Sequence, residues 1–165
     1  MKYRDVMRWM GHRRWFIWTA TQLAPLDAKV VRRSGGRFGI LGNYGLPQCL
    51  VTTEGRKSGQ LRTVTLLYGK LGDDVILVGS NFGQSHHPAW ALNLEANPRA
   101  LLSIGGEEQE MVSRPVTDPQ VREEIWQLMA DMWPAYNLYR GTAGREIKIF
   151  ALTPAGDRSP TGPHH

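Results

Sequence analysis

The sequence predicts a mainly β protein of the α+β class: a small antiparallel β-barrel with flanking helices. Six runs of apolar and β-branched residues have the length of strands, near residues 49–54, 61–69, 74–80, 99–104, 108–116 and 146–152. The links LGDD and GGEE between neighbouring runs are typical of hairpin turns. Few helices separate the runs, so a parallel sheet of βαβ units is excluded and a barrel of antiparallel strands fits better.

Two helices are predicted before the first strand. Residues 3–20 are amphipathic, with Val6 and Met10 on one face and arginines elsewhere. Their basic and aromatic character suits an anionic membrane surface, although packing on the domain or on a second subunit is the simpler interpretation. The segment is too short and too charged to span a bilayer and does not have the form of a signal peptide. A second basic helix begins at Pro25 and ends at the Ser-Gly-Gly sequence of residues 34–36.

Two more helices are predicted between the later strands. Pro88 begins a short helix that stops before Pro98. Asp118 begins another, which has apolar residues at helical spacing and runs to about Met132. Residues 135–144, AYNLYRGTAG, are predicted to be a loop that leads into the last strand.

Length and composition favour one folded domain in a reducing compartment. The chain has 165 residues and a single cysteine, Cys49, which is predicted to be buried in the first apolar run. We divide the chain into a basic N-terminal helical segment (1–36), a barrel domain (37–154) and a disordered tail or tag remnant (155–165).

Charge is distributed unevenly along the chain. The first 50 residues hold nine Lys and Arg against two acids, whereas the remainder holds eleven against thirteen. A basic front end indicates an anionic partner: nucleic acid, a membrane surface or a polyanionic small molecule. The sequence has no nucleotide-binding fingerprint, no metal-ligand spacing and no Ser–His–Asp set, so metal-dependent and hydrolytic chemistry are not expected.

The most informative stretch is the link between the first two predicted strands, VTTEGRKSGQLR at residues 51–62. Its glycines allow a tight turn whose backbone N–H groups a ligand can approach closely. Arg56, Lys57, Ser58 and Arg62 lie in or beside this turn, and these residue types suit a phosphate or a carboxylate. An ordinary solvated basic hairpin is the alternative.

Three further features suit a pocket for a flat, phosphorylated cofactor that would carry the redox chemistry itself. They are a Gly/Ser loop at residues 79–83, an aromatic helix start at residues 88–90, and a cluster of Trp133, Tyr136 and Tyr139. Each has a structural alternative. Buried aromatic residues usually serve packing, and a loop serine can be a simple turn hydroxyl.

The order of three segments resembles the deazaflavin (coenzyme F420)-dependent nitroreductase and quinone reductase family. The segments are TTEGRKSGQLR, VGSNFGQSHHPAWALNLEANP and WPAYNLYRGTAGREIKIFAL, and the resemblance runs from about Ser34 to Thr153. It implies a six-stranded split β-barrel related to FMN-binding oxidoreductases. It also implies hydride transfer from the reduced deazaflavin to a quinone, a nitro compound or another electrophilic small molecule.

The resemblance also assigns roles to matched residues. Those implied to hold the cofactor are Arg56, Lys57, Ser58, Gly59, Arg62, Thr65, Gly79, Ser80, Ala89, Trp90 and Asn93, with the basic ones at its phosphate and acidic tail. Those implied to line the acceptor site are Leu67, Trp133, Tyr136 and Tyr139. The implied catalytic residues are Ser80, Tyr136 and Tyr139, with Tyr136 as hydrogen-bond or proton donor. Leu67 and Trp133 occupy positions that can be tyrosine in the family, which puts reduction of nitro compounds in question but not cofactor binding.

We therefore expect an F420H2-dependent oxidoreductase in the cytoplasm, with residues 3–20 at the inner face of the plasma membrane and a dimer left open. Two alternatives use the same barrel: an FMN-dependent oxidoreductase, and a protein that binds F420 without catalysis. A non-enzymatic nucleic-acid or membrane-binding module is a further alternative. Nucleic acid is not expected as a partner, because the basic residues lie in a hairpin rather than on a long groove-filling face.

Overall fold

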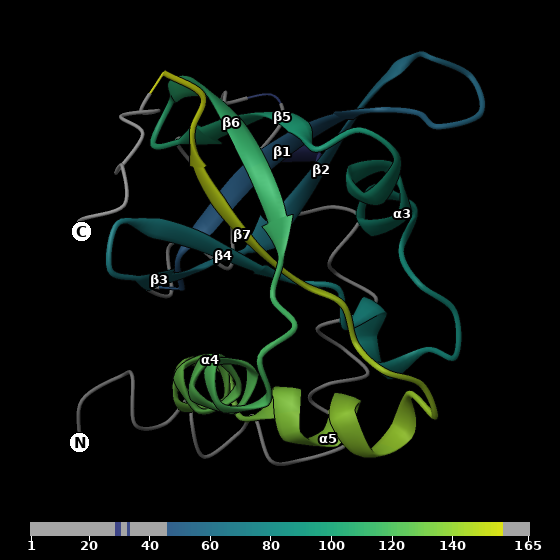
Figure 1. Cartoon of the computed structure of the whole chain (residues 1–165), viewed down its shortest axis with the longest axis vertical. Helices are drawn as coiled ribbons and strands as arrows, with labels where there is room; N and C mark the ends of the chain where they lie inside the picture. Colours follow the sequence, from purple (N-terminus) through teal and green to yellow (C-terminus); the bar gives the residue numbers. More distant parts are fainter. Residues whose placement is uncertain (1–28, 31–32, 34–45, 157–165) are drawn as a thin grey trace, which may run out of the picture.

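The structure is a computed structural model that describes residues 29–30, 33 and 46–156. Figure 1 shows a curved sheet with helices packed against it. Its seven strands are β1 (Gln48–Glu54), β2 (Leu61–Leu67), β3 (Gly69–Leu71), β4 (Asp74–Val78), β5 (Arg99–Ile104), β6 (Glu107–Pro115) and β7 (Ile149–Pro154). They pair antiparallel in the order β2-β1-β5-β6-β7-β4-β3. The predicted mainly β, antiparallel fold with flanking helices is confirmed.

The sheet curls because its two outer strands are neighbours in sequence. Only Tyr68 separates β2 from β3, although these strands lie at opposite ends of the sheet order. The prediction of six strands is wrong by one, since residues 61–69 are not a single strand. The Tyr68 N–H donates to the carbonyl of Pro47 (3.1 Å), and the chain then pairs Gly69 with Ile76 of β4.

Three helices and a 3₁₀ turn accompany the strands within residues 46–156. They are η2 (Asn81–Gly83), α3 (Ala89–Ala96), α4 (Pro119–Met132) and α5 (Ala135–Thr142). The α4 helix begins as predicted, with the Asp118 carboxylate accepting from the N–H groups of Gln120 (2.8 Å) and Val121 (3.0 Å). In Figure 1, α4 and α5 lie together at one end of the sheet, and α3 lies near β1 and β2.

The predicted loop at residues 135–144 is wrong for most of its length, because α5 occupies it. Pro134 ends one helix but also precedes the next, a position where proline is well tolerated. Ala135, Tyr136 and Tyr139 are buried on one face of α5. Burial of this face outweighs the poor helix propensity of the asparagine and glycine in the segment.

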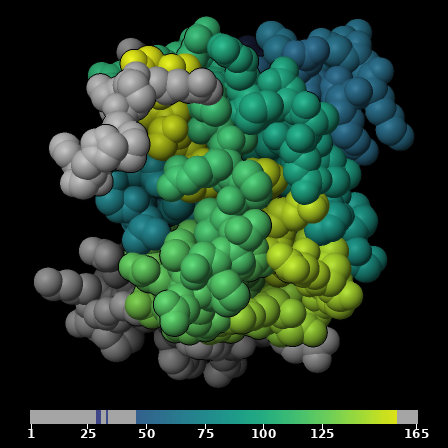
Figure 2. All heavy atoms as spheres, viewed as in Figure 1, coloured from purple at the N-terminus to yellow at the C-terminus, as the bar shows by residue number. Residues whose placement is uncertain are grey.

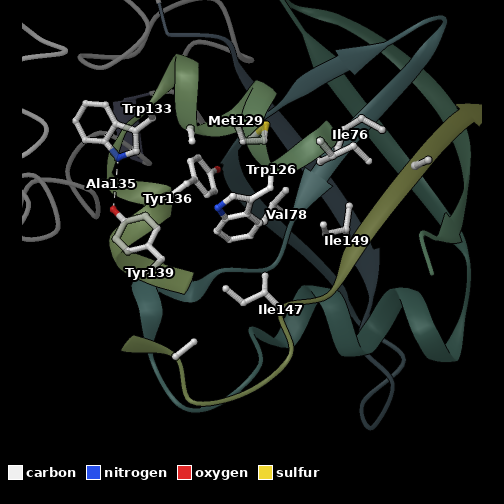
Figure 3. Close-up of a cluster of buried hydrophobic side chains, with 14 residues drawn as sticks. Ile76, Val78, Trp126, Met129, Trp133, Ala135, Tyr136, Tyr139, Ile147 and Ile149 are labelled. Carbon is white, nitrogen blue, oxygen red and sulfur yellow. Dashed lines mark hydrogen bonds between the residues drawn. The ribbon is translucent and has the colours of Figure 1, made fainter. Parts of the chain in front are cut away.

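Buried side chains form two clusters. One fills the curled sheet beneath α3 and includes Cys49, Leu77, Trp90 and Phe150. Burial raises the pKa of the Cys49 thiol, as expected for a core cysteine. The other cluster joins the sheet to α4 and α5, and Figure 3 shows its aromatic side chains. The candidate site lies beside both clusters.

The predicted segments 3–20 and 157–165 lie outside the described residues, as does most of the second predicted helix. Lys29, Val30 and Arg33 of that helix are helical. Among the residues that can be described, none belongs to a helix long and apolar enough to cross a membrane.

Candidate functional site

A cavity of about 560 Å³ opens between β2, the loop after β4, the start of α3 and the aromatic face of α5. Most of its lining is apolar. The residues that line it are Gln48, Arg56, Val64, Thr65, Leu66, Leu67, Val78, Ser80, Asn81, Phe82, His86, His87, Pro88, Ala89, Trp90, Leu92, Trp133, Tyr136 and Tyr139. A space of this size and composition suits a flat organic molecule with a few polar groups.

The basic hairpin bend is built as a tight turn between β1 and β2. Its backbone closes through Gly55 N–H to Gln60 O (2.8 Å) and Gly59 N–H to Gly55 O (2.7 Å). Gly59 has a φ of +67°, which favours glycine. Figures 1 and 2 show this hairpin projecting from the body of the molecule.

Of the five predicted residues in and beside the bend, the structure brings Arg56 to the cavity. Within the described residues, the guanidinium of Arg56 has no hydrogen bond or ion pair. Lys57, Ser58, Gly59 and Arg62 are exposed and lie outside the cavity lining, with the Arg62 guanidinium donating to Gln60 (3.2 Å). Arg56 is therefore the cation best placed for an anionic group at the cavity mouth.

Asn93 connects α3 to the bend and does not line the cavity. Its buried amide oxygen accepts from the backbone N–H of Arg56 (3.1 Å), and its amide nitrogen donates to the Thr53 hydroxyl (3.1 Å). The amide thus fixes where Arg56 leaves the sheet. Gly79 also lies outside the cavity lining. Its N–H donates to Lys148 O (2.8 Å) and so connects the loop after β4 to the segment before β7.

We expect Asn93→Leu to lower the free energy of unfolding by about 2–4 kcal/mol, because it leaves the buried Thr53 hydroxyl and the partly buried N–H of Arg56 without their partner. Chemical denaturation measures this loss. Asn97→Leu, one helical turn further along, is the matched control, since its amide donates to Glu54 at an exposed position (3.0 Å) where water can replace it. Equal losses in the two variants would contradict the role given to Asn93.

Strand β2 and the start of α3 form one wall of the cavity. Thr65 and Leu67 come from β2, and Ala89 and Trp90 from α3. Trp90 is also a core residue, since its ring packs edge-on against Phe150 (5.9 Å between centroids). The Thr65 hydroxyl is buried without a hydrogen-bond partner among the described residues. An orphaned hydroxyl in an apolar wall is suited to a polar atom of a bound molecule.

Another wall is aromatic and comes from α5 and from Trp133, which follows α4. Tyr136 packs edge-on against Trp126 (5.9 Å) and Tyr139 (5.7 Å), and Trp133 Nε1–H donates to the Tyr139 hydroxyl (3.5 Å), as Figure 3 shows. Burial raises the pKa of Tyr136 far above its usual range, and it raises the pKa of Tyr139 as well. Both phenols are therefore neutral at physiological pH, and Tyr136 can donate a hydrogen bond into the cavity.

The loop after β4 forms the third side. Ser80 is buried and lines the cavity, followed by Asn81 and Phe82 with φ of 47° and 55°. Such positive φ values in non-glycine residues mark a strained turn. The half-exposed Phe82 ring contacts Tyr139 edge-on (6.1 Å), so loop and α5 share an aromatic contact at the cavity.

Sequence reasoning missed part of this site. His86 and His87 line the cavity but were not predicted to do so, and Asn81 and Phe82 were predicted only as part of the loop at residues 79–83, without roles of their own. The histidines could have been found from their place directly before the predicted aromatic helix start. Arg145, which binds the carbonyls of this loop, is about sixty residues away and gives no local signal.

The chain matches known proteins over most of its length. The model of a family described as F420H(2)-dependent quinone reductase matches residues 25–154. An F420H(2)-dependent quinone reductase of Mycobacterium tuberculosis is 30% identical over 152 residues, covering 90% of this chain and 98% of that protein. A solved structure of an F420-H2 dependent reductase (FDR-A) is 30% identical, with a TM-score of 0.59, and covers 65% of this chain and 94% of that one. A structure described as a domain-swapped dimer has the same identity and TM-score and covers 65% of this chain and 80% of that one.

Proposed function

Because the chain belongs to the F420H(2)-dependent quinone reductase family, a family of oxidoreductases that use coenzyme F420, we propose that it reduces a quinone in the cavity described above. The observation that carries the proposal is the position of Arg56, whose guanidinium has no partner among the described residues, on the lining of an apolar cavity that also contains Tyr136 and Tyr139. The Arg56 guanidinium suits the anionic tail of the cofactor, and the apolar, tyrosine-lined cavity suits a flat carbonyl compound.

The residues present fit F420. Arg56 would hold its phosphate or acidic tail, with Lys57 and Arg62 of the exposed bend adding positive charge nearby. The orphaned Thr65 hydroxyl, Ser80 and the α3 start would hold the ring. The chemistry that F420 supplies when bound and reduced is a hydride.

The protein's own contribution is binding, orientation and exclusion of water. Leu67, Trp133 and Tyr139 give the acceptor an apolar, aromatic surface, and Trp133 narrows that surface where a tyrosine would add a hydroxyl. Correct placement of two reactants can lower a barrier by about 7–11 kcal/mol, so no nucleophilic side chain is required. The buried Tyr136 hydroxyl holds a proton close to the acceptor site.

We expect Tyr136→Phe to lower kcat for menadione by about 10²-fold, the lower end of what a positioned proton donor contributes. Cofactor affinity should be unchanged, because Tyr136 belongs to the acceptor wall. Steady-state kinetics and a fluorescence titration measure the two quantities. Leu138→Ala, an exposed change on the same helix, is the control. A wild-type kcat in Tyr136→Phe would show that the Tyr136 hydroxyl takes no part in the reaction.

The function is tested by mixing the purified protein with reduced F420 and menadione and following the return of F420 absorbance. The proposal predicts turnover that depends on enzyme concentration. A parallel assay with reduced FMN tests the flavin alternative. Turnover with FMN alone would contradict the proposal, and F420 binding without turnover would favour a carrier protein.

Two finer assignments belong to the same proposal. Residues 3–20 would bring the enzyme to the membrane surface, where quinones reside, and sedimentation with anionic vesicles tests this.

The enzyme would also form a dimer, in keeping with the domain-swapped dimer among its structural neighbours. Light scattering of the full chain measures its mass.

A further inference from the structure

The guanidinium of Arg145 holds the cavity loop in place. Its Nε–H donates to Gln84 O (3.1 Å), and its Nη2 donates to Gly79 O (3.1 Å) and Ser80 O (3.3 Å). Arg145 belongs to the segment between α5 and β7, so these contacts tie the loop to a distant part of the chain. One planar cation therefore fixes both ends of the turn that carries Ser80.

The same guanidinium determines the protonation of His87. Arg145 Nη1 lies 2.9 Å from Nδ1 of His87. A guanidinium can only donate, so the Nδ1 atom must accept this hydrogen bond and carries no proton. A neutral imidazole whose Nδ1 is an acceptor carries its proton on Nε2. The contact thus selects one of the two tautomers of His87.

The charges around His87 favour the neutral ring. Burial lowers its pKa, and the positive charges of Arg145 and Lys148 lower it further. Glu95 of α3 acts in the opposite direction, but it forms an ion pair with Lys148.

His87 lines the cavity immediately before the start of α3. Because Arg145 occupies Nδ1, Nε2 is the ring nitrogen that remains for a bound molecule. We propose that His87 donates a hydrogen bond from Nε2 to a carbonyl oxygen in the cavity, and that Arg145 is a positioning residue that selects this tautomer. The inference rests on the proposed function, in which both the deazaflavin and the quinone carry carbonyl groups.

The tautomer is measured directly by nitrogen NMR of the full, ligand-free chain labelled at histidine. His87→Gln identifies the His87 signal among the five histidines. The proposal predicts an unprotonated Nδ1 and a protonated Nε2 at pH 7. Arg145→Gln should give a mixture of tautomers and move the pKa of His87 up towards its ordinary value of about 6.5.

Arg114→Gln is the matched control, because Arg114 pairs with Asp74 on the sheet and is not part of the cavity lining. It should leave the His87 signal unchanged. A wild-type ring protonated on Nδ1 would overturn the proposal even if Arg145→Gln failed to fold. An unchanged His87 signal in a folded Arg145→Gln variant would overturn the role of Arg145.

The hydrogen bond itself is tested with His87→Gln and His87→Leu. A glutamine amide can donate from nearly the position of Nε2, whereas leucine cannot. We expect His87→Leu to weaken the binding of the molecule that accepts this hydrogen bond by about 3- to 10-fold. His87→Gln should restore most of the lost affinity. A higher Kd for oxidised F420 would assign the carbonyl to the cofactor, and a higher KM for menadione would assign it to the acceptor.

Equal values for wild type and His87→Leu in both assays would overturn the donation. If wild-type protein did not bind F420 at all, the proposed function would fail, while the NMR result would still decide whether Arg145 sets the tautomer. The two failures are therefore distinguishable.

Discussion

Arg56→Ala is expected to raise the Kd for F420 by about 10- to 100-fold. A charge-assisted hydrogen bond contributes about 1.5–3 kcal/mol, and each 1.4 kcal/mol is a factor of ten in affinity. Arg56 is the basic residue of the bend that reaches the cavity lining, and its guanidinium has no competing partner among the described residues. Fluorescence titration of oxidised F420 measures the change.

Lys57→Ala is the matched control, since Lys57 is the next residue and a cation but does not line the cavity. Its loss should change Kd by only about 2- to 3-fold, because exposed charges are screened by water and salt. Arg56→Lys should fall between the two, since it keeps the charge but loses the planar fork. Unchanged affinity in the Arg56→Ala, Lys57→Ala double variant would argue against the bend as the anion site.

Gly83→Ala is expected to lower the free energy of unfolding by about 2–4 kcal/mol, or Tm by about 4–16 °C. Gly83 has a φ of +76°, and an added Cβ would overlap the Thr142 hydroxyl and come within 3.0 Å of Tyr139 Cα. The clash would push α5 away from the loop at residues 80–83. Calorimetry measures Tm, and KM for menadione should rise because the acceptor wall moves.

Gly105→Ala is the control for backbone strain alone. Its φ is +61°, but no atom lies within 4 Å of an added Cβ. It should cost about 1–2 kcal/mol, the ordinary penalty for a left-handed alanine. If Gly83→Ala lost no more stability than Gly105→Ala, the claim that the loop at residues 80–83 packs closely against α5 would be contradicted.

The sequence predicted the features that local chemistry determines. Glycines in the bend, Asp118 before α4 and Pro88 before α3 each act within a few residues, and the corresponding elements are present. The family and its F420 dependence, which the order of three motifs predicted, are also confirmed. The roles assigned to individual site residues stay predictions, although nine of them line one cavity: Arg56, Thr65, Leu67, Ser80, Ala89, Trp90, Trp133, Tyr136 and Tyr139.

What the sequence did not show depends on tertiary contacts. Tyr68 has strong strand propensity, and only the curl of the sheet makes it a break between β2 and β3. Residues 135–142 contain Asn137 and Gly141, which suggest a loop, and they are helical because Tyr136 and Tyr139 are buried. His87 and Arg145 lie 58 residues apart, so no local pattern could have joined them.

The most direct measurement compares the affinity of F420 with that of its tailless deazaflavin chromophore, which lacks the phosphate and the acidic groups. Because Arg56 and the basic bend would hold the anionic tail, intact F420 should bind at least about 10-fold more tightly than the chromophore. Arg56→Ala should remove most of that difference. Equal affinities for the two molecules in the wild-type protein, or tighter binding of FMN than of either, would contradict the account.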